Sequence, residues 1–354
     1  MAKELTFGIQ AAPVGEKPDH ELYPEVVEDC RLAYELGYDS AWFLEHAFSD
    51  YYPTPSPLIF LSHVAAAVPN LNLGTAVLVL PWYNPLRIAG EIAMVNTLTK
   101  GRLMLGIGRG TAKSEYDAYG VDMNEARGRL VEVHRIVETA LKGEPFTYDG
   151  TYFKITKPVQ IRPAPFGKEV QFYGAIGSPG SAENVARMGL PLLCQSQFPP
   201  HVLTRVLQAW DGAIEKTTRP AAPHVISMRA IVAESDEAAQ EIARKYLPRA
   251  FEVQRRHYLP EADPWEGIPE YAGFARMFEN LGKLTDPDNL GPFMQLQLIG
   301  GPETVARRIE AIAELGFEYI VVAAAPPGFP QKLRQDTYRR FAREVAPRFS
   351  SRFR

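Results

Sequence analysis

Short β-rich runs alternate with amphipathic helical stretches along this chain of 354 residues, and this alternation constrains the fold most strongly. Strands joined by helical crossovers are typical of parallel sheets. The sequence predicts eight strands, over residues 5–10, 40–44, 71–80, 102–108, 170–175, 191–195, 224–233 and 319–324. It predicts helices over residues 23–36, 87–98, 126–141, 181–188, 202–214, 236–246 and 303–315. Eight strands with crossover helices favour a closed (β/α)8 TIM barrel over an open, doubly wound sheet.

Two long segments do not fit a minimal barrel. Residues 143–168 are rich in proline and aromatic residues, and Asp149-Gly150 predicts a small hairpin turn there. Residues 257–295 contain recurring Pro, Gly and Asp without periodicity, which is typical of lids, interface arms or disordered loops. We therefore expect one barrel domain over residues 1–354 with two insertion segments.

Composition excludes several classes of function. The 38 basic and 42 acidic residues are spread along the chain for a net charge of −4, so no basic block predicts nucleic-acid binding. The two cysteines, Cys30 and Cys194, indicate no disulfide framework and favour a reducing cytosol. No apolar run resembles a signal peptide or reaches the roughly 18 residues that span a bilayer, so the expectation is a soluble cytoplasmic protein.

The active sites of such barrels lie at the C-terminal ends of the strands. The second predicted strand ends in the sequence WFLEHAF, which places Glu45 and His46 at this end. An isolated Glu-His pair is more often structural than catalytic. The seven histidines show neither HxH nor HExxH spacing, so the sequence predicts no metal site.

Two glycine-rich stretches predict anion binding. In LGIGRGT, residues 105–111, the glycines do not have the GxGxxG spacing of a dinucleotide site, but Arg109 leaves the fourth strand as a fixed cation suited to phosphate. Arg127 is a possible second cation, although a solvated helix position explains it at least as well. In GAIGSPGSAENVA, residues 174–186, Ser178 and Ser181 lie where a helix begins at Ser181 or Ala182. A phosphate site and an ordinary serine cap account for this pattern equally well.

Four separated stretches together resemble the bacterial luciferase-like, flavin-dependent monooxygenase family. They read GYDSAWFLEHAF, LNLGTAVLVLPWYNPLR, TKGRLMLGIGRGTAKSEYDAYGVDMNEAR and GGPETVARRIEAIAELGFEYIVV. The similarity runs from about Gly37 to Arg127, weakens through the proline-rich segment, returns at GSPGSAENVARMGLP and resumes near Gly300. About half of the chain is covered.

The resemblance implies a (β/α)8 barrel that binds reduced FMN at its C-terminal mouth. There the flavin reacts with O2 at C4a, and the hydroperoxide transfers one oxygen to a small organic substrate. His46 matches the catalytic histidine, whereas Glu45 is expected to brace the strand end. Ala76 and Val77 match a pair joined by a cis peptide bond behind the flavin. The matched cofactor-binding residues are Ala76, Val77, Arg109, Thr111, Ala112, Arg127, Gly177, Ser178, Gly180 and Ser181.

The resemblance also implies partners and a pocket. A separate flavin reductase is expected to supply reduced FMN, and the family tendency is a homodimer packed through early barrel helices. Residues 257–295 are expected to close over a pocket walled by aromatic side chains, namely Phe48, Tyr51, Tyr52, Trp82 and Tyr83. The chain departs from luciferase proper at Ala47, Gly108 and Ser196, where luciferase has histidine, cysteine and an aromatic residue. Light emission is therefore not predicted.

Two other functions remain open. An F420-dependent hydride-transfer enzyme resembles this family in fold, but it needs positive charge for a longer acidic tail, and no dense basic cluster follows Ser181. The second alternative is a non-catalytic flavin-binding protein. Such a protein has less need of His46, so the presence of His46 together with both arginines argues against it. Affinities for reduced FMN, oxidised FMN and F420 distinguish these alternatives.

Overall fold

A computed structural model describes residues 4–15, 17–167, 169–195, 198–215, 218–260 and 262–353. Within them, eight parallel strands form a closed ring because β9 pairs with both β8 and β11. These strands are β1 (Thr6–Ala11), β2 (Ser40–Phe43), β3 (Asn72–Val79), β4 (Leu103–Gly108), β7 (Gln171–Ala175), β8 (Leu192–Gln195), β9 (Val225–Val232) and β11 (Tyr319–Ala323). The predicted (β/α)8 barrel is confirmed. A short strand, β10 (Leu298–Gly300), extends the sheet beside the end of β9.

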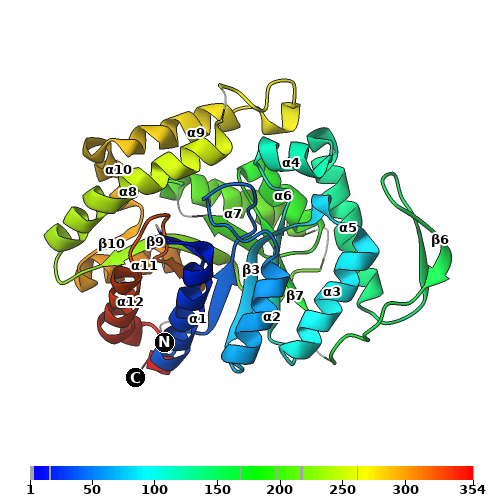
Figure 1. The fold of residues 1–354 in the computed structure, drawn as a ribbon, viewed down its shortest axis with the longest axis horizontal. Coiled ribbons are helices and arrows are strands. Elements are labelled where there is room, and N and C mark those ends of the chain that lie inside the picture. The colour runs from blue at the N-terminus through cyan, green and yellow to red at the C-terminus, as the bar shows by residue number, and fades with distance from the viewer. Residues whose placement is uncertain are drawn as a thin grey trace.

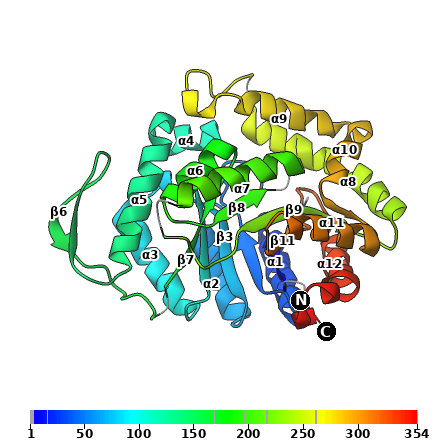
Figure 2. The same ribbon diagram turned by 180° about the vertical axis from the view of Figure 1, so that it is seen from behind.

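Helices surround the ring, as Figures 1 and 2 show. They are α1 (Asp19–Leu36), α2 (Pro57–Ala67), α3 (Pro85–Leu98), α5 (Ala126–Ala140), α6 (Pro179–Arg187), α7 (Pro200–Ile214), α11 (Pro302–Glu314) and α12 (Gln331–Arg340). In α1, an apolar face that includes Val26, Cys30 and Ala33 is buried against the barrel, and the helix ends at Gly37 with φ 96°. No described helix has the length and apolar character to cross a membrane.

The interior of the barrel is filled below its mouth. Trp42 is fully buried and packs edge-to-face with Tyr173 and Tyr319. Its indole N–H donates to Ser40 Oγ at 2.7 Å, and Ser40 Oγ lies 2.5 Å from the Tyr319 hydroxyl. Because these rings occupy the axis, space for a ligand remains only toward the C-terminal ends of the strands.

Both insertion segments contain regular structure. The first forms the predicted antiparallel hairpin, from β5 (Phe146–Asp149) and β6 (Lys154–Val159). Its connection is fastened to α5, because the Glu132 carboxylate accepts backbone N–H groups from Thr151, Tyr152 and Phe153.

The second insertion follows a helix that is longer than predicted. The helix α8 (Asp236–Tyr258) continues through Pro248 and ends at Tyr258, so the predicted end at Tyr246 is wrong. It continues because Leu247 and Phe251 are buried in an apolar cluster with Phe329. Helices α9 (Phe274–Gly282) and α10 (Leu290–Gln295) follow, and Figures 1 and 2 show all three across one end of the barrel.

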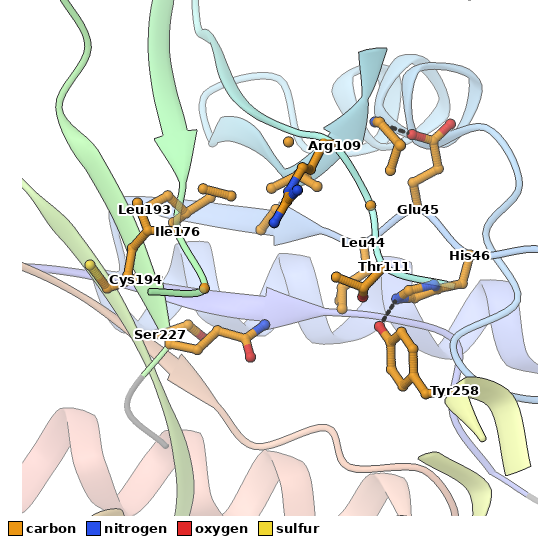
Figure 3. A pocket seen from close by; sticks show the side chains of 18 of the residues that line it. Leu44, Glu45, His46, Arg109, Thr111, Ile176, Leu193, Cys194, Ser227 and Tyr258 are labelled. Atoms are coloured by element: carbon orange, nitrogen blue, oxygen red, sulfur yellow. Dashed lines mark hydrogen bonds between the residues drawn. The ribbon is translucent and has the colours of Figure 1, made fainter. Parts of the chain in front are cut away.

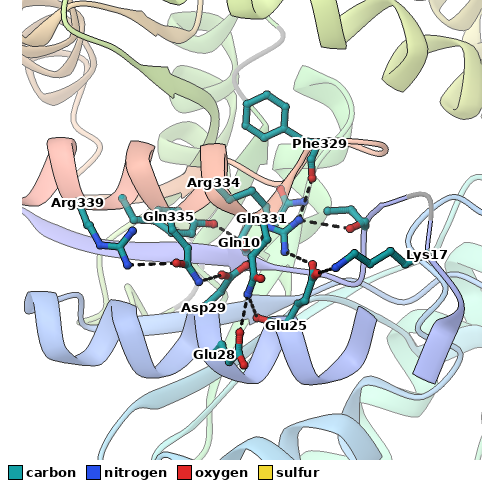
Figure 4. Close-up of polar contacts among 12 residues, drawn as sticks. Gln10, Lys17, Glu25, Glu28, Asp29, Phe329, Gln331, Arg334, Gln335 and Arg339 are labelled. Carbon is teal, nitrogen blue, oxygen red and sulfur yellow. Dashed lines mark hydrogen bonds and ion pairs between the residues drawn. The ribbon is translucent and has the colours of Figure 1, made fainter. Parts of the chain in front are cut away.

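A buried cation joins α1 to α12, as Figure 4 shows. Arg334 is 1% exposed, and its guanidinium lies 2.9 Å from Asp29 Oδ2 and 3.2 Å from Glu25 Oε2. It also donates to the carbonyl oxygens of Val14 and Phe329. This group ties the last barrel helix to the first.

Candidate active site

A pocket opens at the C-terminal mouth of the barrel, where several strands end (Figure 3). The predicted site residues that line it are His46, Ala76, Val77, Arg109, Thr111, Gly177 and Ser181. The other four predicted residues do not line it: Ala112 is buried at the start of α4 (Lys113–Tyr119), and Arg127, Ser178 and Gly180 lie outside the lining. Ser196 is outside the described residues.

His46 follows β2 and turns its ring into this pocket. Its side chain is 14% exposed, and its Nε2 atom lies 3.4 Å from the Tyr258 hydroxyl of α8. The ring also packs beside Tyr51 and His257, with centroids 4.9 Å and 4.8 Å away. An imidazole with one polar atom facing a partly closed pocket is suited to proton transfer.

Glu45 turns away from His46, as Figure 3 shows. Its carboxyl accepts the backbone N–H of Val79 at 2.5 Å and the hydroxyl proton of Tyr83. Burial raises the pKa of Glu45 to about 8. The interpretation that Glu45 braces the strand end is confirmed, because it joins the end of β2 to that of β3.

The peptide bond between Ala76 and Val77 is cis, as the resemblance implied. Both residues line the pocket beside Gly108. A Cβ atom at Gly108 would lie 2.9 Å from Val77 Cγ2, so a cysteine there requires Val77 to move. This close contact gives a physical basis for glycine at position 108, where the resemblance places a cysteine in luciferase.

The two predicted phosphate arginines meet at one carboxylate. Arg109 Nη1 lies 3.0 Å from Glu270 Oε2, and Arg127 Nε lies 2.7 Å from Glu270 Oε1. The Arg109 guanidinium also lies 4.1 Å from the centre of the Tyr271 ring. The structure therefore brings both cations to one anionic group of the second insertion, a contact that sequence reasoning missed.

Helix α6 begins earlier than predicted. Ser178 is its N-cap and Pro179 its first residue, so the predicted start at Ser181 or Ala182 is wrong. Ser178 and Ser181 form a reciprocal capping box, in which Ser181 Oγ accepts the N–H groups of Gly177 and Ser178 at 3.1 Å and 2.9 Å. The positive end of the helix dipole is thus directed at the pocket rim that Gly177 and Ser181 line.

The aromatic wall differs from the prediction. Of the five expected residues only Tyr51 lines the pocket; Phe48 is 68% exposed, Tyr52 is buried, and Trp82 and Tyr83 line a neighbouring groove. The wall comes instead from α8 and α9, through Tyr258, Phe274, Met277 and Phe278. Aromatic residues are frequent in residues 257–295 although the segment shows no periodicity. This enrichment was the sequence signal for the wall, and sequence reasoning overlooked it.

The second insertion is fastened over the mouth by hydrogen bonds to the loop after β4. The Trp265 indole N–H donates to the Thr111 carbonyl at 2.8 Å, and the Tyr271 hydroxyl donates to the Gly110 carbonyl at 3.0 Å. Trp265 also stacks on Phe278. The expectation that this segment closes over the pocket is met by an ordered arrangement of helices.

Three groups of metal-ligand type meet at the wall of the pocket, although the spacing of histidines in the sequence predicted no metal site. One ligand atom from each of His46, Glu115 and His257 lies within 4.8 Å of the others. Glu115 lies on α4 and His257 near the end of α8, so no short motif contains them. Sequence reasoning missed both residues.

Comparisons with known proteins show the family to which the chain is similar. The family described as luciferase-like monooxygenase matches residues 5–319. The uncharacterized protein y4vJ of Sinorhizobium fredii is 40% identical over 129 residues, covering 36% of this chain and 37% of that protein. The oxygenase component of the flavin-dependent trigonelline monooxygenase of Acinetobacter baylyi is 28% identical over 65% of each chain.

Two further relatives are similar over nearly the full length. The F420-dependent glucose-6-phosphate dehydrogenase of Microbacterium testaceum is 26% identical over 100% of both chains. The crystal structure of monooxygenase RslO1 from Streptomyces bottropensis superposes with a TM-score of 0.80 at 24% identity, covering 98% of this chain and 100% of that one. The family match and the shared barrel lead to one conclusion: the chain belongs to the luciferase-like monooxygenase family.

Proposed function

We propose that the protein is the oxygenase component of a two-component, FMN-dependent monooxygenase. One observation carries the proposal: a single mouth brings together His46, the Ala76–Val77 pair, Arg109 and the N-terminus of α6. Arg109 and the first turn of α6 supply positive charge to this pocket, and His46 supplies an imidazole. That combination suits a flavin, which has an anionic phosphate at one end and a reactive ring at the other.

The residues present fit reduced FMN. Arg109, Arg127 and the first turn of α6 would hold the phosphate, and Ala76 and Val77 would lie against the ring. When bound, reduced FMN activates O2 and supplies one oxygen atom to a small organic substrate. Tyr258 and the α9 side chains would exclude water. His46 Nε2 would hold or accept a proton at the reacting centre.

A separate flavin reductase would deliver the reduced cofactor. The trigonelline relative is itself described as an oxygenase component, which supports such a partner. No stretch of this sequence has the fingerprint spacing of a nicotinamide site. Purified protein should therefore turn over only when reduced FMN is supplied.

Binding and isotope experiments test the proposal. We expect tighter binding of reduced FMN than of oxidised FMN or F420, and incorporation of one ¹⁸O atom from ¹⁸O2 into an oxidised aldehyde, terpene or aromatic substrate. Equal binding of both FMN redox states without oxygen incorporation would sink the monooxygenase proposal.

F420-dependent hydride transfer is the second candidate. It is favoured by the full-length similarity to the F420-dependent dehydrogenase. F420 has a longer acidic tail than FMN and would need positive charge beyond the phosphate position. The basic side chain that follows Ser181 on α6 is Arg187, and it pairs with Glu183 at 3.0 Å. Tighter binding of F420 than of reduced FMN would favour this candidate.

Glu270 occupies the position where Arg109 and Arg127 would meet a phosphate, so we expect it to compete with FMN. Glu270→Gln keeps the side-chain size but removes the charge, and we expect FMN to bind about 3- to 10-fold more tightly, the size expected for two partly exposed ion pairs. Fluorescence titration measures this, with riboflavin, which lacks the phosphate, as the control ligand. Equal gains for both flavins would mean that Glu270 acts on the second insertion alone.

We also propose a homodimer formed through α2 and α3. Ile59, Met94 and Leu98 are 74%, 48% and 55% exposed, and Ile59 and Met94 line one groove between these helices. Ile59→Lys should convert the dimer to a monomer, measured by light scattering. Glu241→Lys on α8 is the control and should leave the dimer intact, whereas a monomeric unmodified protein would contradict the proposal.

A further inference from the structure

Glu115 lies at the centre of a buried polar cluster that consists of His46, Glu115 and His257. Glu115 is 1% exposed and His257 is 5% exposed. Glu115 Oε1 accepts the backbone N–H of Ala47 at 2.7 Å, and it lies 3.4 Å from His46 Nδ1 and 3.9 Å from His257 Nε2. Both of these ring nitrogens are buried and have no hydrogen-bond partner within 3.5 Å that meets the usual geometry. The same carboxyl oxygen is therefore the polar atom that they face.

The contacts of His257 determine which of its nitrogens carries the proton. Burial and the neighbouring His46 lower the pKa of His257 to about 2, so its ring is neutral and holds one proton. Ser49 Oγ lies 2.7 Å from His257 Nδ1 and accepts the N–H of Tyr51 at 3.2 Å. Its second lone pair and its own proton let it serve either tautomer, so the Glu115 oxygen 3.9 Å from Nε2 favours the Nε2–H form. His257 then carries its proton on Nε2, which faces Glu115. The opposite tautomer would direct a lone pair at the carboxylate.

The same argument applies to His46. A lone pair on Nδ1 would face the Glu115 oxygen at 3.4 Å, so a proton on Nδ1 is favoured. Nε2 then has the lone pair, and it faces the pocket and the Tyr258 hydroxyl at 3.4 Å. Distances somewhat longer than a hydrogen bond are common before a substrate or cofactor is bound.

We propose that Glu115 is a positioning residue that holds His46 as the Nδ1–H tautomer and presents a basic Nε2 to the pocket. His257, whose Nδ1 lies 2.7 Å from Ser49 Oγ, faces the same carboxyl oxygen with its Nε2. Glu115 does not act on the substrate itself: its effect passes through His46, as an aspartate acts through histidine in serine proteases. The role of Glu115 in turnover rests on the proposed function, whereas the tautomer of His46 does not depend on it.

NMR of the protein without cofactor tests this directly. In ¹⁵N-histidine-labelled protein, we expect His46 Nδ1 in the protonated range and Nε2 in the unprotonated range, with the signals identified by their absence from His46→Asn. Glu115→Leu, which removes the acceptor at similar volume, should move His46 toward the Nε2–H tautomer. Glu115→Gln should keep the Nδ1–H tautomer, because its amide oxygen can still accept a hydrogen bond from His46 Nδ1–H.

Matched controls make the outcomes distinct. Glu138→Leu removes a carboxylate that lies 3.5 Å from His134, outside the pocket, and should leave the His46 signals unchanged. The proposal is overturned if His46 is already the Nε2–H tautomer, if Glu115→Leu leaves it unchanged, or if one equivalent of Zn²⁺ shifts His46 Nδ1 and His257 Nε2 together. In the last case the cluster would be a metal site.

Activity provides an independent measurement. We expect Glu115→Leu to lower kcat by about 100-fold or more with little change in FMN affinity, because the base then presents the wrong tautomer. If FMN does not bind to the unmodified protein, the proposed function fails while the NMR result still stands. If kcat falls but the tautomer does not change, the positioning role is wrong.

Discussion

Replacing Arg334 with methionine is expected to lower the free energy of unfolding by about 3–5 kcal/mol, because it leaves the buried Asp29 carboxyl group without its cation and leaves Glu25 with Lys17 alone. Asp29 is 4% exposed and lies 2.9 Å from this guanidinium. The Val14 and Phe329 carbonyl groups also lose a donor. Urea denaturation measures the change, which should appear as a lower midpoint with an unchanged slope.

The loss of stability in Arg334→Met should increase as the pH rises. Burial already raises the pKa of Asp29 in the folded protein, despite the opposing charge of Arg334. Without that cation the pKa rises further, so the folded variant retains a proton that the unfolded chain releases. Stability then falls as the pH rises above the ordinary carboxyl pKa. The deficit of the variant relative to the parent protein should therefore be larger at pH 8 than at pH 5.

Two control variants separate charge burial from loss of a side chain. Arg348→Met breaks an exposed ion pair with Glu303 and should cost less than about 1 kcal/mol. Combining Arg334→Met with Asp29→Leu and Glu25→Leu removes the carboxyl groups that faced the cation and should recover much of the lost stability. If the single and triple variants are equally destabilised, the network stabilises the fold through packing rather than charge.

The fold was predictable because its strands are short, apolar and separated by strong turn signals. All eight barrel strands lie where the sequence places them, and Gly37 ends α1 as expected. Helix α2 was missed because the sequence PLIFLSHVAAA is apolar almost throughout and shows little periodicity. The end of α8 was missed because burial of Leu247 and Phe251 outweighs a proline in the middle of the helix.

The site was predictable only where it lies in continuous motifs. His46, Arg109 and Ser181 each follow a strand closely, so barrel geometry places them at one mouth. Glu270 and His257 come from a segment without a pattern, and they meet partners such as Arg109 and Ser49 that are 161 and 208 residues away. Contacts of that kind depend on how the second insertion packs over the barrel, which periodicity does not encode.

His46→Ala is expected to lower kcat by about 10²–10⁴-fold, the range associated with loss of a general acid or base. The Kd for FMN should change little, because in the proposed complex Arg109, Arg127 and the first turn of α6, and not His46, would hold the phosphate. Without a proton-holding group, a larger share of the O2 consumed should be released as hydrogen peroxide, with the reduced flavin oxidised and no oxygen transferred to the substrate. The ratio of oxygenated product to peroxide measures this coupling.

A variant of a histidine outside the pocket tests whether the loss of turnover in His46→Ala is specific to the active site. His63 lies on the outer face of α2 and stacks on Phe60, so His63→Ala should leave turnover and coupling unchanged. Tyr258→Phe removes the hydroxyl that faces His46 Nε2 at 3.4 Å and should show a smaller effect than His46→Ala. Loss of FMN binding in His46→Ala would assign His46 to the structure of the pocket. Full coupling with the imidazole removed would assign the proton step to another group in the pocket, such as the Tyr258 hydroxyl.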